Sequence, residues 1–133
     1  MSLTKVRTAL ETALNGMSPA LSTAWENTAF TPVANTAYQR PTLMPATPSN
    51  PEYGSSYIEQ GIFQISLFYP LQVGASAAAA RAELLRSTFK RGNSFTSSGV
   101  TVTITRTPEV SAGTVDGDRW FLPVKIRFSA FIS

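Results

Sequence analysis

The sequence contains neither cysteine nor histidine. These absences exclude disulfide frameworks, the usual zinc ligands and catalytic systems in which histidine is the base. Lysine is scarce too: Lys5, Lys90 and Lys125 all fall on predicted polar faces. Serine–lysine catalysis, which needs a buried lysine, therefore has no candidate. We expect no enzyme activity, no catalytic residues, no metal and no cofactor.

Acidic residues are few, with 8 Asp and Glu in 133 residues. The only close acidic pair is Asp116 and Asp118. Gly117 between them makes a turn a plainer interpretation than a pair of catalytic carboxylates or a calcium site. The 11 Lys and Arg residues, which give a net charge of +3, are scattered along the chain. Dedicated nucleic-acid binders usually cluster such charge, so the sequence argues against that class.

Long hydrophobic runs are absent as well. No segment approaches the ~20 apolar residues that span a bilayer, so no membrane contact is expected. The start, Met1-Ser2-Leu3-Thr4-Lys5, lacks the basic and apolar blocks of a signal peptide, and we expect synthesis in the cytoplasm. The length suits one domain over residues 1–133.

Two segments have the spacing of amphipathic helices, residues 3–16 and 75–91. In the second, Ala78, Ala82, Leu85 and Phe89 form the predicted buried stripe, whereas Arg81, Arg86 and Lys90 are predicted to point away. Gly92 suits the position just after the helix.

Strands are predicted by alternating or β-branched residues at 23–28, 38–46 and 57–69, around Val100–Ile104, and after a turn at Asp116-Gly117. The predicted class is α+β. It comprises a mixed, mostly antiparallel sheet with two helices packed on one face, in the order α-β-β-β-α-β-β-β.

Two surfaces are candidates for contacts. The Pro-rich loop 47–56 is predicted to be exposed and long enough for a functional role. The outer face of the last strand mixes arginine with aromatic residues, as protein interfaces do, unless the second helix covers it. Aromatic residues near Arg40 would stack nucleobases or anchor irregular segments. Together these surfaces give the predicted assembly interface: Arg40, Tyr53, Tyr57, Arg119, Phe121, Lys125, Arg127 and Phe131.

Several motifs, in order, resemble one family. They are Trp25-Glu26-Asn27-Thr28-Ala29-Phe30, Arg40-Pro41-Thr42-Leu43-Met44-Pro45-Ala46, Gln60-Gly61-Ile62-Phe63-Gln64-Ile65-Ser66, Tyr69-Pro70 with Gly74, Phe89 with Arg91-Gly92, and Gly117-Asp118-Arg119 with Leu122-Pro123-Val124. This order and spacing, over nearly the whole chain, resembles the tail-terminator-like proteins of long-tailed bacteriophages and prophages.

The resemblance implies a non-enzymatic virion protein that caps the tail tube and forms the surface joining tail to head. It implies a homo-oligomeric ring, a hexamer in the usual case, with the major tail tube protein and a head–tail connector protein as partners. Non-specific contact with DNA in the lumen of such a ring is an additional expectation. The alternatives are another head–tail joining or minor tail protein and, behind these, a DNA-binding module.

Overall fold

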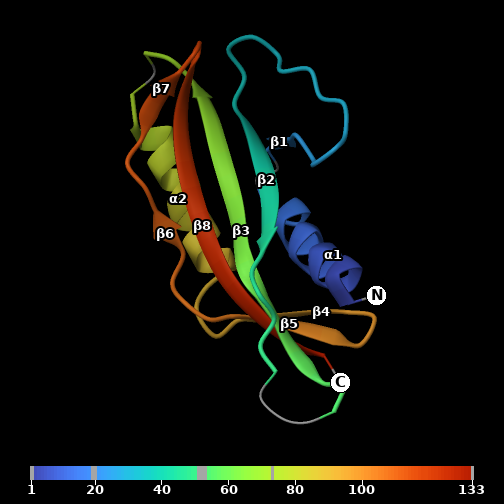
Figure 1. The fold of residues 1–133 in the computed structure, drawn as a ribbon. Coiled ribbons are helices and arrows are strands. Elements are labelled where there is room, and N and C mark those ends of the chain that lie inside the picture. The colour runs from blue at the N-terminus through green and yellow to red at the C-terminus, as the bar shows by residue number, and fades with distance from the viewer. Residues whose placement is uncertain (1, 19–20, 51–53, 73, 133) are drawn as a thin grey trace.

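Two long antiparallel strands form the centre of the molecule, which a computed structural model describes at residues 2–18, 21–50, 54–72 and 74–132. Strands β3 (Tyr57–Pro70) and β8 (Arg119–Ile132) pair along their whole length. In both strands the apolar residues alternate, so that one side of the pair carries most of the core. This pair is the axis of Figure 1.

Shorter strands extend the sheet on both sides. On the β3 side lies β2 (Tyr38–Pro45), followed by β1 (Ser22–Thr23), which pairs with β2 in parallel. The other edge of β8 is shared along its length by three antiparallel partners, and a fourth strand lies beyond the last of them. These four are β7 (Thr114–Asp116), β6 (Glu109–Val110), β5 (Val100–Ile104) and, outermost, β4 (Ser94–Ser97).

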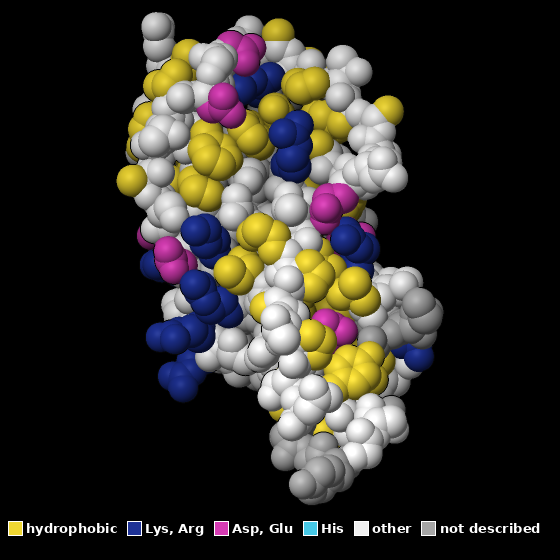
Figure 2. All heavy atoms as spheres, viewed as in Figure 1, with side chains coloured by type: hydrophobic (Ala, Val, Ile, Leu, Met, Phe, Trp, Pro, Cys, Tyr) yellow, Lys and Arg dark blue, Asp and Glu magenta, His cyan; other side chains and the backbone are white. Residues whose placement is uncertain are grey.

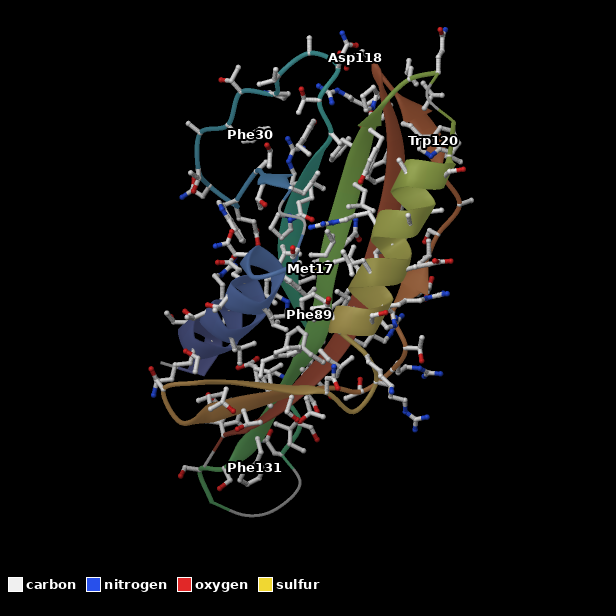
Figure 3. All side chains as sticks on the ribbon, turned by 180° about the vertical axis from the view of Figure 1, so that it is seen from behind. Met17, Phe30, Phe89, Asp118, Trp120 and Phe131 are labelled. Carbon is white, nitrogen blue, oxygen red and sulfur yellow. The ribbon has the colours of Figure 1, made fainter. Side chains whose placement is uncertain are left out.

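Both helices, α1 (Ser2–Asn15) and α2 (Ser76–Thr88), cover the same face of the sheet (Figures 1 and 3). Leu10 of α1 and Leu85 of α2 are fully buried against sheet residues such as Phe63 and Ile126. The predicted α+β class, with its helix and strand order, is thus confirmed, and β4 and β6 are short additions to it. Within the described residues, no helix has the length and apolar character needed to cross a membrane.

Two element ends differ from the prediction by more than one residue. The strand expected at 23–28 ends at Thr23, because the chain turns away and Asn27 adopts a left-handed backbone conformation with φ 54°. The second helix ends at Thr88 rather than continuing to Arg91. The Lys90 carbonyl instead accepts the N–H of Asn93 in a turn, and Gly92, with φ 90°, lies inside that turn.

Arg81 is the one residue of α2 whose predicted direction is wrong. Its side chain is buried, with 6% of the residue exposed. It lies between Ala78 and Leu85 on the buried stripe, and small neighbours leave space for its long stem. Burial lowers the pKa of the Arg81 guanidinium, partly opposed by Tyr69. Burial likewise raises the pKa of Tyr69, partly opposed by the charge of Arg81.

Candidate assembly surface

The face of the sheet opposite the helices, called here the helix-free face, carries most of the predicted interface residues. Figure 2 shows the molecule from this side, with apolar side chains along the middle. Strand register places Tyr38 beside Phe68 and Phe68 beside Phe121 at one end. At the other end, Phe131 lies directly opposite Ile58.

The first end is closed by the chain itself. The ring centroids of Tyr38 and Phe68 are 4.8 Å apart, and those of Phe68 and Phe121 are 5.2 Å apart. Phe30, from the segment 24–37, completes this cluster at 5.1 Å from Tyr38. The covering element is therefore this segment and not the second helix. Phe121 is half-buried, because part of its ring packs against this cluster within the same chain.

Arg119, one of the residues predicted for the assembly interface, is buried and fastens the covering segment. Only 5% of the residue is exposed. Its guanidinium donates to the carbonyl oxygens of Thr36 and Val33, the latter at 2.7 Å, and lies 5.1 Å from the ring centroid of Tyr38. Because segment 24–37 folds over the start of β8, the outward position in the strand becomes an internal one. Arg119 positions a loop and offers little surface to a partner.

Glu26 fastens the other end of the same segment. Its Oε1 accepts the backbone N–H of Leu43 at 2.8 Å and Nη1 of Arg7 at 2.9 Å. Burial alone would raise the pKa of this carboxyl, but these two partners outweigh it and the pKa is lowered. The stretch from Trp25 to Phe30 is thereby held between α1 and β2. It borders an open hollow of about 560 Å³ with Arg40, which is exposed and lies 5.5 Å from the Phe68 centroid.

The second end of the helix-free face is uncovered by the described part of the chain. Phe131 is 55% exposed and Met44 37% exposed, while Ile58 and Ile62 are half-buried. Register places Met44 opposite Ile62 on this face. We call these four residues the open patch. Its isoleucines were missed in the sequence analysis. Positions 58, 60, 62 and 64 are two residues apart, so both isoleucines share the polar face of the glutamines at 60 and 64.

The remaining predicted residues lie around these two ends. Lys125 and Arg127 are half-buried between them, with Arg127 Nη1 3.6 Å from Glu109 Oε1. Tyr57 is half-buried next to the open patch, but alternation turns it to the opposite side of the sheet. Tyr53 lies outside the described residues. The loop 47–56 that contains it is joined to β3 by two backbone hydrogen bonds between Ser49 and Ile58, of 2.9 and 2.7 Å.

The outer edges of the sheet are poorly suited to pairing with a strand of another molecule, so the helix-free face is the main surface for contacts. Beyond β1, the outer edge of β2 contains Pro41 and Pro45, which have no N–H, and the N–H of Leu43 is taken by Glu26. The opposite edge is the four-residue strand β4. Short or proline-containing edges are typical of sheets that avoid strand addition. Among the described residues, no group of three or more acidic side chains is placed to hold a metal ion.

Comparisons with known proteins match this chain to a protein family and to a solved structure of similar fold. The family model described as phage tail terminator protein matches residues 5–128. A solved structure is similar over 100% of this chain and 98% of its own, with 28% identity and a TM-score of 0.82. Among curated proteins, none matches the sequence. Because the family model spans nearly the whole chain, this protein belongs to the phage tail terminator family and is a structural component of a phage tail.

Proposed function

We propose that the protein closes the end of the tail tube as a ring of identical subunits and presents the surface to which the head is joined. The family match carries this proposal. In it, the subunit contacts its neighbour, the major tail tube protein and a head–tail connector protein, and it resides in the virion tail.

The open patch supports the ring. In a closed ring each subunit contacts its neighbour through two different surfaces. The open patch, an exposed aromatic residue among aliphatic ones, has the composition of an interface core. The short and proline-containing edges of the sheet disfavour strand addition. We therefore assign the open patch to the contact with the neighbouring subunit, made through the helix-free face of the sheet.

The closed end supports a joining role at a different surface. Arg119 and Glu26 hold segment 24–37 in place, so the stretch bordering Arg40 is presented on a fixed scaffold. A preorganised loop loses less conformational entropy on binding than a free one. We assign this surface to contact along the axis of the tail, with the tube or the connector.

Electron microscopy of the purified protein, with mass measurements over a range of concentrations, tests the ring. We expect closed rings of tube diameter and a discrete oligomer mass. Tubes of the major tail protein provide the second arm: added protein should be found at one tube end and should stop elongation. A protein that remains monomeric with and without tubes would refute the capping role. Rings that bind a connector but leave tube growth unchanged would favour another head–tail joining protein.

A further inference from the structure

Five cations of the chain lie together at one edge of the fold, although they are scattered in the sequence. Several cations are engaged elsewhere: Arg7 contacts Glu11 and Glu26, and Arg81 and Arg119 are buried. Others surround the segment 105–109, which runs from the end of β5 to the start of β6. Figure 2 shows Lys and Arg side chains gathered along one border of the helix-free face. We call this group the basic edge: Arg86, Arg91, Arg106, Lys125 and Arg127.

Hydrogen bonds, strand register and the lining of one hollow place these residues around that segment. Arg86 Nε donates to the Pro108 carbonyl at 2.9 Å. The Thr105 N–H donates to the Arg127 carbonyl at 3.1 Å, and Lys125 lies opposite Glu109 in the strand register. Charges that are scattered along the sequence are thus brought together in three dimensions, because chain reversal places residues far apart in the sequence side by side.

The basic edge has a hollow whose lining contains only cations and hydroxyls. Arg91, Thr105, Arg106 and Thr107 border an open space of about 490 Å³. Two carboxylates lie among these cations: Glu109, whose side chain is 55% exposed and lies 3.6 Å from Arg127, and Glu83, which borders another hollow with Arg86. Five cations against two carboxylates leave a local excess of positive charge. The open patch, by contrast, consists of apolar side chains.

We propose that the basic edge binds the phosphate backbone of double-stranded DNA without regard to sequence. Arginine and threonine are among the side chains that proteins use for phosphate contacts, and guanidinium matches phosphate oxygens in a two-pronged manner. A protein partner is less favoured, because interface cores are depleted of charge and this hollow lacks an apolar side chain among its lining residues. Within the proposed ring, this edge would face DNA passing through the channel. The location of the DNA therefore rests on the proposed function, whereas the binding itself does not.

Fluorescence anisotropy of a labelled 30-base-pair duplex, titrated with purified protein at 50 and 200 mM salt, tests the proposal. Three to five phosphate contacts predict an affinity loss of roughly 40- to 500-fold over this range. A second duplex of unrelated sequence should bind equally well. No measurable binding at 50 mM salt, or an affinity unaffected by salt, would overturn the inference.

Two charge-matched variants locate the site. The double variant Arg91→Gln with Arg106→Gln should reduce the slope of log affinity against log salt by about 2. Lys5→Glu on α1 changes the net charge by the same amount away from the basic edge and should leave most of the slope. Both variants replace surface side chains, so thermal unfolding should change little. Equal losses in the two variants would show that net charge alone acts, and would refute the assignment.

Polyglutamate is the competing ligand. If the protein bound polyglutamate as tightly as DNA, and the double variant Arg91→Gln with Arg106→Gln lost both, the partner would be an acidic protein and the DNA assignment would be overturned. Microscopy of the same preparations separates this inference from the capping role. Rings without DNA binding would refute only the inference made here, whereas DNA binding by a protein that forms no ring would refute only capping.

Discussion

Arg7 and Glu26 join the first helix to the segment that follows it, with 2.9 Å between Nη1 of one and Oε1 of the other. The same Glu26 oxygen accepts the N–H of Leu43 in β2. One carboxylate thus connects α1, the covering segment and an edge of the sheet. This explains physically why a glutamate stands within the stretch Trp25–Phe30: it fixes a backbone path and needs no ligand to account for it.

Replacing Glu26 with glutamine should destabilise the protein by about 1 kcal/mol, because the charged acceptor loses its ion pair while part of the hydrogen bonding persists. Urea unfolding followed by circular dichroism measures the change. Glu83→Gln is the control, since Glu83 is an exposed position on α2, and should stay within about 0.5 kcal/mol of the parent. Equal effects of the two substitutions would contradict the role given to Glu26.

The same carboxylate predicts a pH dependence. Its partners hold the pKa of Glu26 in the folded state below the ordinary value of 4.5, although burial opposes them. The unfolded chain therefore binds a proton more readily over the interval between the two pKa values. The contribution of Glu26 to stability is present above pH 4.5 and is lost as the pH falls through the folded-state pKa.

Unfolding free energies measured from pH 7 down to pH 3 should fall more steeply for the parent protein than for Glu26→Gln, and the two curves should converge at the acid end. Parallel curves for the parent and Glu26→Gln would show that the Glu26 carboxylate has no such linkage.

Arg119→Met should loosen the segment 24–37 while leaving the main sheet paired. The substitution removes the two hydrogen bonds to the Thr36 and Val33 carbonyls and the contact with the Tyr38 ring. The expected loss is about 1–3 kcal/mol. Hydrogen exchange should rise in 24–37 far more than in β3. Arg119→Lys keeps the charge but not the planar fork, so it should give an intermediate result. Unchanged exchange in 24–37 for Arg119→Met would argue against the fastening role.

Helices and long strands were predictable because their signals are local. The three- and four-residue spacing in 3–16 located α1 to within one residue, and alternation located β3 and β8. Turn chemistry at Asp116-Gly117 likewise located the β7–β8 hairpin, where Gly117 has φ 60°.

The surfaces were harder to predict because they depend on contacts between distant segments. Alternation places Arg119 on the outer side of β8, but only the tertiary fold brings Val33, 86 residues away in sequence, onto it. The basic edge has the same origin, since Arg91 and Arg106 are brought together by β4 and β5. Phe131 is exposed because it stands near the end of its strand, beyond the reach of the covering segment.

Phe131→Asp should weaken or abolish ring formation, because it places a charge in the centre of the proposed subunit contact and removes its largest apolar side chain. Loss of a central aromatic anchor costs an interface about 2–4 kcal/mol, equivalent to a dissociation constant raised roughly 30- to 900-fold.

Val115→Asp is the matched control: Val115 is also an exposed apolar strand residue, 64% exposed, but pairs with Trp120, away from the open patch. Mass photometry at several concentrations should show subunits for Phe131→Asp and the parent oligomer for Val115→Asp. Both variants should fold, since both side chains are exposed in the single chain. Intact rings of Phe131→Asp, stable to dilution like those of the parent, would place the subunit contact elsewhere on the molecule.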